Sequence, residues 1–285
     1  MPPAPIQELR DLTRTRKQLT REIVQHVQRI QAVLEEANVK LSSVISDVLG
    51  PSGRRILRAI IVGETDAESS ERLGCGRVAL TEALTGRIHE HHRFLLAQHL
   101  RTIEQLEESV AAFDARIASA LAPFREVVER LNEVPGLGRI AIETIIAEIG
   151  TDMSAFPTAG HLVSWAGLAP RLDESAGKRR STRIKNGAPW LKPTLVQSGW
   201  AATRKKNTYL QAQFLRLKAR RGPKKALIAV AASILTIVYH MLRDGTCYRD
   251  LGPEYFARRN PAKLAAKLAN RIRNLGYQVE ISVAA

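Results

Sequence analysis

The sequence is poor in cysteine. Only Cys75 and Cys247 occur in 285 residues, and neither lies in a CxxC motif or beside a cluster of cysteine and histidine. Disulfide frameworks need several paired cysteines, and structural zinc sites need such clusters, so both classes of protein are excluded. The N-terminus, MPPAPIQELRDL, also lacks the apolar core of a secretory signal peptide. These absences predict a protein of the cytosol.

Acidic residues are nearly absent from one stretch. Residues 171–225 contain 16 Lys and Arg but only 2 Asp and Glu, whereas residues 1–170 contain 19 basic and 22 acidic residues. Nearly all of the formal charge of +15 is therefore concentrated in this stretch. Such a charge density favours a polyanionic partner, most commonly a nucleic acid. The alternative is a basic face that only confers solubility, although solubility needs only a modest net charge.

Long apolar runs are also scarce, and the exception is residues 226–242. This segment, ALIAVAASILTIVYHML, carries no charge and is flanked by Lys and Arg. Its length is at the short limit for crossing a bilayer, and it includes Ser233, Thr236 and His240. We therefore interpret it as a buried core helix rather than a membrane span, and we expect no membrane partner.

Helical spacing of apolar residues extends over residues 1–132. The spacing predicts one long amphipathic helix over residues 9–49, a short helix near residues 54–62, and a second long helix over residues 78–131 that Gly86 or Pro123 can interrupt. In the second long helix, apolar residues repeat close to a heptad from Leu96 to Leu121. This pattern predicts an antiparallel coiled-coil hairpin, and an ordinary helical bundle is the alternative.

A glycine-rich turn begins at Val134, in VPGLGRIAIETIIAEIG. Pro135, Gly136 and Gly138 predict a tight turn that opens a helix starting near Arg139, as in a helix-hairpin-helix element. In such an element the glycines let the backbone approach a phosphate, and the first amides of the helix donate to it. We therefore predict that Gly136, Gly138 and Arg139 bind nucleic acid. A plain loop between two packed helices is the alternative.

The basic stretch predicts a loop up to about residue 188 and then one helix from residue 190 to about residue 219. The last 40 residues predict small helices or a terminal strand. Cations of the stretch are interpreted as phosphate contacts: Arg183, Lys185, Lys192, Arg204, Lys205, Lys206, Arg216, Arg220, Arg221, Lys224 and Lys225. Trp190, Trp200 and Tyr209 lie among them and can stack on bases. Trp190 and Trp200 share a helix with Leu191 and Leu195, so we interpret both as core residues.

The order of these motifs resembles one family. ELRDLTRTRKQLTREI, VPGLGRIAIETIIAEIG, GHLVSWAGLAPRLDESAGKRRSTRIKNGAPWLKPTLVQSGWAA and RGPKKALIAVAASILTIVYHMLRDGTCYRDLG occur in the order typical of insertion-sequence transposases of the bridge-RNA-guided recombinase family. These are the IS-one-ten group and its IS-eleven-eleven branch. The resemblance covers residues 8 to about 277.

The resemblance and the helical patterns together predict a mainly α fold. We expect a long helical coiled-coil hairpin over residues 1–132. A helical transposase domain over residues 133–250 should contain the helix-hairpin-helix-like element and the basic serine loop, and a C-terminal tail over residues 251–285 should pack on the core.

The family has an N-terminal RuvC-like domain in which Asp and Glu bind divalent metal, and a transposase domain in which a serine attacks the DNA phosphodiester. Its acidic residues normally lie upstream of the ELRDL motif, and only eight residues precede Leu9 here. The resemblance therefore implies a chain without the RuvC-like domain. It also implies no cofactor or metal in this chain, with magnesium expected in the missing domain.

The partners implied by the resemblance are DNA, a structured guide (bridge) RNA and further copies of the chain joined through the coiled coil. The implied location is the bacterial cytoplasm, in association with the nucleoid.

The resemblance also implies a nucleophile. The family's serine lies in a turn shortly after a Gly-Leu-x-Pro segment, and the counterpart here, GLAPRLDESAGK, places it at Ser175. Lys178, Arg179 and Arg180 follow and can hold the scissile phosphate and stabilise the charge that builds on it. The alternative is a turn serine in a basic loop. This sequence departs from the family in Ala176, where glycine is usual, and in RIKNGAP, where the family tends to have Gly-Asn.

We consider three functions for this sequence. The first is a DNA transposase or recombinase chain that keeps the serine half of a composite active site and is inactive alone. The second is a non-catalytic nucleic-acid-binding remnant or regulator of full-length transposase. The third, tyrosine-type recombination through Tyr209 or Tyr239 with His240, is disfavoured because Tyr239 lies inside the most apolar helix.

Overall fold

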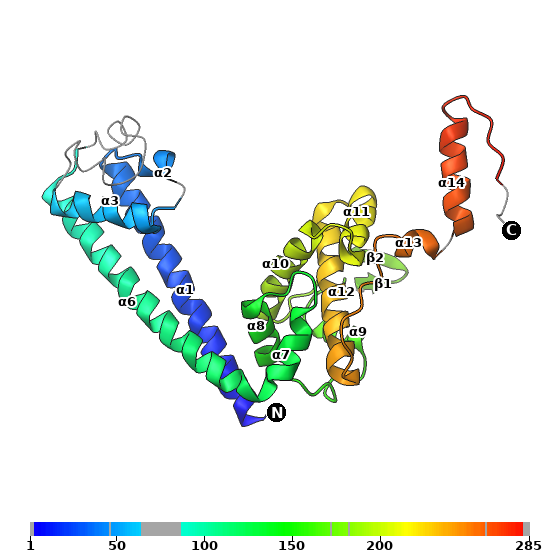
Figure 1. Cartoon of the computed structure of the whole chain (residues 1–285), viewed down its shortest axis with the longest axis horizontal. Helices are drawn as coiled ribbons and strands as arrows, with labels where there is room; N and C mark the ends of the chain where they lie inside the picture. The colour runs from blue at the N-terminus through cyan, green and yellow to red at the C-terminus, as the bar shows by residue number, and fades with distance from the viewer. Residues whose placement is uncertain are drawn as a thin grey trace. The chain divides into compact units, whose positions relative to one another are not determined.

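The computed structural model describes residues 3–45, 47–63, 87–171, 173–181, 183–259 and 261–281. These residues form helices joined by short loops, with one two-stranded sheet among them, so the mainly α prediction is confirmed. The contacts divide the chain into two compact units (Figure 1). Unit 1 comprises Met1–Arg10 and Leu121–Ala285, and unit 2 comprises Asp11–Ala120. The predicted domain boundary at residue 132 stays a prediction.

Unit 2 is built from long helices with short ones at one end. Helix α1 spans Ala4–Glu36, α2 spans Leu41–Val44, α3 spans Pro51–Val62, and α6 spans Glu90–Leu121. The first helix ends earlier than residue 49, because Asn38 adopts a left-handed φ of 57° that a helix cannot continue. The predicted start of the second long helix, with Gly86, lies outside the described residues. A 3₁₀ turn, Ala122–Phe124 (η1), interrupts that helix at Pro123, as predicted.

Helices α1 and α6 run antiparallel within unit 2 (Figure 1). Nη1 of Arg16 lies 2.7 Å from Oδ1 of Asp114, and Nδ1 of His26 lies 3.1 Å from Nδ1 of His99. The later residue of α1 contacts the earlier residue of α6, so the two helices run in opposite directions. These contacts join the two helices inside one chain.

The apolar stripes of α1, α3 and α6 meet in one core. Its buried members from these three helices are Ile30, Val33, Leu34, Ile56, Leu57, Ile60, Leu96, Leu100 and Ile103. The stripes at this end of the unit are therefore covered within the chain itself. A coiled-coil register and self-association through these helices stay predictions.

Unit 1 is organised around a central apolar helix, α12, which spans Pro223–Asp244. Around it lie α7 (Arg125–Asn132), α9 (Ala159–Trp165), α10 (Leu191–Arg204) and α11 (Tyr209–Arg221), all of which contact it. Helix α8 spans Arg139–Ile149 and packs between α7 and α10 (Figure 1). By length and composition α12 is the candidate membrane span among the described residues. Its burial by four helices confirms the prediction of a core helix.

The predicted single helix from residue 190 to about residue 219 is wrong, because α10 and α11 are separate helices. The chain leaves α10 at Lys205, where ψ is 111°, and Asn207 adopts a φ of 58°. Thr208 then begins α11, because its side chain accepts a hydrogen bond from the amide of Gln211 at 3.3 Å. An asparagine in left-handed conformation followed by an N-cap threonine is a local stop and restart signal.

The C-terminal region forms α13 (Tyr255–Arg258) and α14 (Pro261–Arg273), and none of the described residues after Ser181 forms a strand of the sheet. The amide of Tyr248 donates to Oε2 of Glu133 at 3.0 Å, and the ring of Tyr209 stacks on Phe256 at 5.2 Å. The segment up to α13 is thereby attached to α7 and α11.

The beginning of the chain also belongs to unit 1. Nε and Nη2 of Arg10 donate at 3.0 Å to the carbonyl oxygens of Ala147 and Glu148, in the last turn of α8. The last carbonyls of a helix have no partner within it, so a guanidinium placed there acts as a cap. This contact anchors residues 4–10 to α8.

The burial of α12 predicts that substituting two isoleucines of unit 1 by alanine has different effects on stability. Ile234 on α12 is fully buried, whereas the side chain of Ile140 on α8 is 59% exposed. We expect Ile234→Ala to lower the free energy of unfolding by about 2–5 kcal/mol, because the substitution leaves a cavity. Ile140→Ala should change it by no more than about 0.5 kcal/mol. Urea unfolding of both variants tests this, and equal effects would contradict a protein core around α12.

Candidate functional site

Ser175 lies in a short β-hairpin rather than in the loop that the sequence predicts. Strand β1 (Asp173–Ser175) pairs antiparallel with β2 (Lys178–Ser181). The connection has two residues, Ala176 with φ of 51° and Gly177 with φ of 72°. Positive φ at both positions is the requirement of the tight hairpin turn whose twist matches the strands. The alanine in this turn, and strands without apolar alternation, explain why the sequence pattern did not predict it.

The register of the hairpin places a cation beside the candidate nucleophile. Ser175 is directly opposite Lys178 across the turn, and both residues are exposed. Directly opposite residues point to the same face, with Cβ atoms about 5 Å apart. A phosphate in contact with the Ser175 hydroxyl is therefore within reach of the Lys178 ammonium. The backbones of Arg179 and Arg180 lie in β2, and their side chains lie outside the described part of the structure.

The base of the hairpin is held by close backbone contact between two glycines. A Cβ built on Gly187 would lie 2.4 Å from the carbonyl carbon of Ala166, and one built on Gly167 would lie 2.7 Å from Cα of Gly187. Gly167 also has a φ of 73°. Side chains at these positions would separate the two segments. Sequence reasoning missed this role, although both glycines lie in motifs that it singled out, WAGLAP and KNGAP.

The cation of Lys192 contributes to the same region. Its Nζ donates to the carbonyl oxygen of Lys185 at 2.9 Å. Lys192 lies in the first turn of α10, so the contact ties the segment that leaves the hairpin to that helix. The structure thus gives Lys192 an internal partner in addition to the phosphate that the sequence predicts for it.

The turn between α7 and α8 contains two glycines with different surroundings. Gly136 has a φ of 89°, and a Cβ built on it would lie 2.2 Å from the carbonyl oxygen of Ser198 in α10. The close approach to α10 therefore accounts for this glycine. Gly138, at the N-cap of α8, is exposed and has no heavy atom within 4 Å of a built Cβ. Only Gly138 keeps the open geometry that a phosphate at the start of α8 needs.

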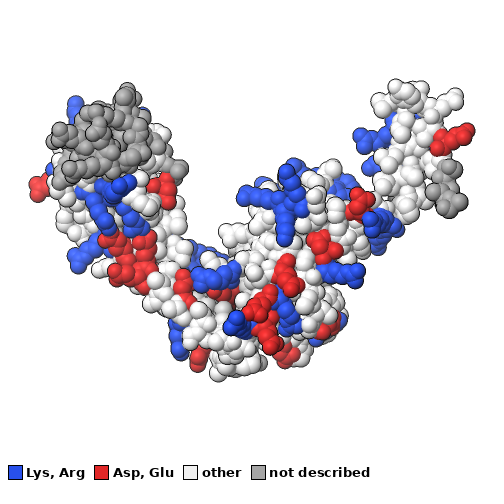
Figure 2. All heavy atoms as spheres, in the orientation of Figure 1, with Lys and Arg blue, Asp and Glu red and all other residues white. Residues whose placement is uncertain are grey.

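The remaining predicted phosphate contacts lie on exposed surface. Those with exposed side chains are Arg183, Lys185, Arg204, Lys205, Lys206, Arg216, Arg220, Arg221, Lys224 and Lys225. The sequence has no Asp or Glu from residue 175 to residue 243, so no carboxylate within α10, α11 or the start of α12 neutralises them. Figure 2 shows Lys and Arg gathered at the end of unit 1 where α10 and α11 lie. Arg139 differs, because its Nη1 lies 3.2 Å from Oε1 of buried Glu143.

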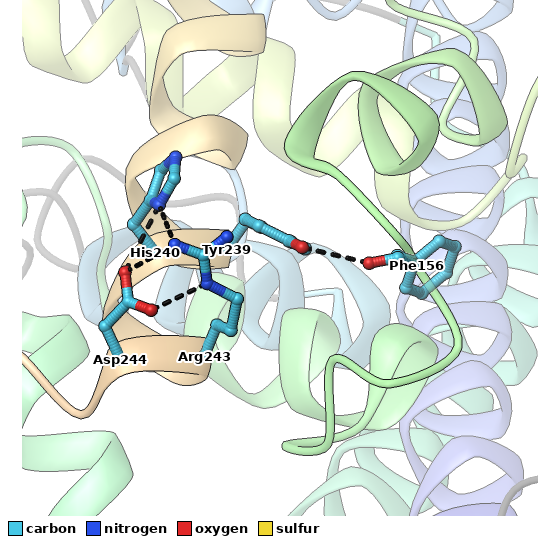
Figure 3. A network of polar contacts seen from close by, with 5 residues as sticks. All are labelled: Phe156, Tyr239, His240, Arg243 and Asp244. Atoms are coloured by element: carbon cyan, nitrogen blue, oxygen red, sulfur yellow. Dashed lines mark hydrogen bonds and ion pairs between the residues drawn. The ribbon is translucent and has the colours of Figure 1, made fainter.

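Tyr239 is not an accessible nucleophile. Its side chain is 1% exposed, and its hydroxyl donates to the carbonyl oxygen of Phe156 at 2.9 Å (Figure 3). Arg243 donates to both oxygens of Asp244, at 2.6 and 2.9 Å, and this hydrogen bonding lowers the pKa of the Asp244 carboxyl. His240 contacts the same carboxylate at 3.4 Å. The polar groups around Tyr239 are thus engaged with one another, which argues against tyrosine chemistry.

Tyr209, the other candidate tyrosine, is half-buried. Burial raises the pKa of its hydroxyl, so the phenolate is disfavoured. The ring packs against Tyr255 and Phe256, each with a centroid distance of 5.2 Å. These contacts give Tyr209 a structural role between α11 and α13.

The two tryptophans of the basic stretch differ. Trp190, just before α10, is half-buried. Trp200, on α10, is 47% exposed. The interpretation of Trp200 as a core residue is therefore wrong, because nearly half of its surface is open to solvent. Helical spacing places Trp200 near apolar residues but does not show where the neighbouring helix ends.

A divalent metal does not fit the described residues. No group of three or more His, Cys, Asp or Glu among them could hold a metal ion. The basic stretch also lacks carboxylates beyond Asp173 and Glu174. Carboxylates are the ligands that magnesium prefers.

Comparison with known proteins finds a transposase family model that matches this region. Residues 128–215 match the family model described as Transposase IS116/IS110/IS902 family. This range includes the turn of Gly136 and Gly138, the hairpin of β1 and β2 that carries Ser175 (the serine hairpin), α10 and part of α11. Residues 128–215 are therefore similar to the transposases that this family model describes.

Curated relatives agree with this match. The chain is 30% identical over 156 residues to the insertion element IS110 43.6 kDa protein of Streptomyces coelicolor, covering 53% of the chain and 37% of the relative. It is 26% identical over 160 residues to a putative transposase (y4pF/y4sB) of Sinorhizobium fredii, covering 54% and 41%. It is 27% identical over 187 residues to the pilin gene-inverting protein of Moraxella bovis, covering 59% and 58%. The chain thus spans 37% to 58% of the length of these relatives.

The two glycines of the turn before α8 should respond differently to substitution. Gly136→Ala should lower the free energy of unfolding by about 2–4 kcal/mol, because it combines a left-handed backbone with overlap on α10. Gly138→Ser should leave stability unchanged or raise it slightly, because serine is a favoured N-cap and space is open there. Thermal unfolding of both variants tests this. A tolerated Gly136→Ala would contradict the packing of the turn on α10.

Proposed function

We propose that this chain acts in DNA transposition or recombination, binding DNA through its basic surface and supplying Ser175 as the nucleophile. One observation carries the proposal. Within the residues that match the transposase family, the hairpin turn places Ser175 directly opposite Lys178 on an exposed face. A hydroxyl with an adjacent cation, accessible to a polymer, is suited to attack a phosphodiester.

The proposed step is a transesterification. The Oγ of Ser175 attacks the phosphorus, forming a phosphoserine ester, and the bond from phosphorus to one deoxyribose oxygen breaks. The serine proton is lost to solvent, and the departing oxygen takes up a proton. Negative charge builds on the non-bridging phosphate oxygens, where Lys178 stabilises it. One phosphoester replaces another, so the later rejoining of strands needs no external energy source.

The exposed cations of α10, α11 and the start of α12 bind the DNA backbone in this proposal. Their contacts set affinity and position but carry little sequence information. Sequence recognition then comes from base pairing with a structured guide RNA, as the resemblance implies, so the basic surface binds RNA as well as DNA. We place this activity in the bacterial cytoplasm.

The metal-binding half of the composite active site belongs, in this proposal, to a RuvC-like domain that carries the magnesium ion. The described residues hold no cluster suited to that ion. We also propose that copies of the chain associate through the α1 and α6 helices, which would bring two serine hairpins to one DNA substrate. The chain alone then binds DNA without completing strand transfer.

A non-catalytic binding module or regulator of full-length transposase is the second candidate. Ala176 favours it, because the left-handed φ of 51° costs an alanine about 1 kcal/mol relative to glycine. A turn that does not have to position a reactive serine tolerates such a residue. Both candidates share the basic surface and differ only in the chemistry at Ser175.

The nucleophile is tested by covalent trapping. Offered a nicked DNA substrate together with the RuvC-like domain of a longer relative, the chain should form a protein–DNA adduct visible on a denaturing gel. Ser175→Ala should abolish the adduct, because no other hydroxyl takes its place at the turn. Ser181→Ala is the matched control, since it removes a serine from the end of β2 that is farthest from the turn. This variant should keep the adduct. An adduct that persists in Ser175→Ala contradicts the assignment, and its absence in every variant supports the binding module.

The basic surface is tested by the salt dependence of binding. Duplex DNA binding should weaken at least about 100-fold between 50 and 200 mM salt, because several phosphate contacts each release counterions. Lys224→Ala/Lys225→Ala should reduce the slope of log K against log salt by about 2. Arg125→Ala removes an exposed cation of α7 that is paired with Glu129, and it should leave the slope unchanged. A Kd insensitive to salt would contradict the electrostatic surface.

A further inference from the structure

Trp200 forms an aromatic pair that is open to solvent on one side. Its ring lies 6.0 Å from that of Phe214 on α11, at an interplanar angle of 55°. Phe214 is 7% exposed, whereas Trp200 is 47% exposed and the next residue of α11, Leu215, is 56% exposed. Phe214 therefore packs against the indole from the protein side, and nearly half of Trp200 stays open to solvent.

The groups around this pair are cations. Arg204 follows Trp200 by one helical turn on α10, which places both residues on the same side of the helix. Nζ of Lys218, one turn after Phe214 on α11, lies 6.0 Å from the centroid of the Phe214 ring. Neither helix contains an Asp or Glu. The aromatic surface is thus bordered by cations of α10 and α11, which attract an anion, and neither of these two helices supplies a carboxylate.

We propose that Trp200, supported by Phe214, is a stacking platform for an unpaired base of single-stranded DNA or RNA, whose phosphates contact Arg204 and Lys218. The inference rests on the nucleic-acid binding of the proposed function and is independent of Ser175. Every base has a π face, so stacking needs no particular sequence. In a duplex the bases are already stacked on one another, so the platform selects unpaired segments over paired ones.

The charge pattern decides between occupants of this patch. An apolar protein surface would bury Trp200 and Leu215, but it would also remove the surrounding cations from water without partners, which is unfavourable. A single strand matches both parts of the patch, since its bases cover the indole and its phosphates pair with the cations. In the proposed function a guide RNA pairs with one DNA strand, so the opposite strand is left unpaired.

A second tryptophan provides an internal comparison. Trp165 on α9 is 44% exposed and lies 5.6 Å from Phe156 at an angle of 59°, which is close to the geometry of Trp200 and Phe214. Its surroundings differ, because residues 140–170 contain three acidic residues and no Lys or Arg. Arg243 lines a cavity with Phe156, but its guanidinium is bound to Asp244. If exposure of an indole were sufficient, both tryptophans would bind a single strand equally well. The stacking platform predicts that only Trp200 does.

The test compares binding of a labelled twelve-nucleotide oligothymidylate and of a twelve-base-pair duplex at one fixed salt concentration. Trp200→Ala should weaken binding of the single strand by about tenfold or more and that of the duplex by less than about twofold. Trp200→Phe should restore most of the single-strand affinity, because phenylalanine also stacks. Trp165→Ala should leave both affinities within about twofold. Equal loss for both nucleic acids, or no loss in Trp200→Ala, overturns the proposal.

Fluorescence keeps the proposal testable if Trp200→Ala does not fold. The variant Trp165→Phe/Trp190→Phe leaves Trp200 as the sole tryptophan, and saturating oligothymidylate should quench its emission while the duplex should not. Unchanged emission in the saturated complex overturns the stacking platform. A blue shift with anionic phosphatidylglycerol vesicles, without a response to the oligonucleotide, overturns it in favour of a membrane surface.

The two proposals can fail separately. Loss of single-strand binding in Trp200→Ala, combined with an adduct that does not depend on Ser175, would leave the platform in place and remove the nucleophile. Normal single-strand binding in Trp200→Ala, combined with an adduct that requires Ser175, would do the reverse. Absence of binding to any nucleic acid would remove both.

Discussion

Burial of α12 is the constraint on which the architecture of unit 1 depends. This helix presents apolar side chains around much of its circumference, and α7, α9, α10 and α11 each cover part of it. The approach of α10 is close, since a Cβ on Gly199 would lie 3.2 Å from Cδ1 of Leu227. The position of α10 then determines the positions of the groups that contact it or extend from it. The turn at Gly136 packs on its backbone, Lys192 holds the segment after the serine hairpin, and Trp200 projects from its outer face.

The same helices that form this core carry the uncompensated charge. Helices α10 and α11 bury Leu195, Leu210 and Phe214 on one side and expose arginine and lysine on the other. Like charges held at this density repel one another and work against the compact state. Apolar burial offsets that repulsion, and bound phosphates would relieve it further. In the proposed function, an anionic partner would therefore stabilise unit 1 as well as being bound by it.

Sequence patterns predicted the elements whose apolar spacing is regular. Long helices in unit 2, the break at Pro123, the turn before α8 and the core helix α12 all follow from local spacing or from proline and glycine. The serine hairpin did not, because its strands are short and polar and its turn uses Ala176 in an unusual conformation. The break between α10 and α11 was missed although Asn207 and Thr208 supply a local signal for it. The position of Gly136 against α10 and the exposure of Trp200 depend on contacts between elements distant in sequence, which no local pattern contains.

The order of synthesis gives the Arg10 contact a consequence. Unit 1 is discontinuous, since residues 1–10 belong to it and all of unit 2 lies between them and residue 121. The carbonyl groups that Arg10 binds are those of Ala147 and Glu148, so the contact cannot form until that part of the chain has left the ribosome. Chains fold domain by domain during translation, with earlier segments first. All of unit 2 is therefore synthesised, and can fold, before α8 is available to bind Arg10 in the first turns of α1.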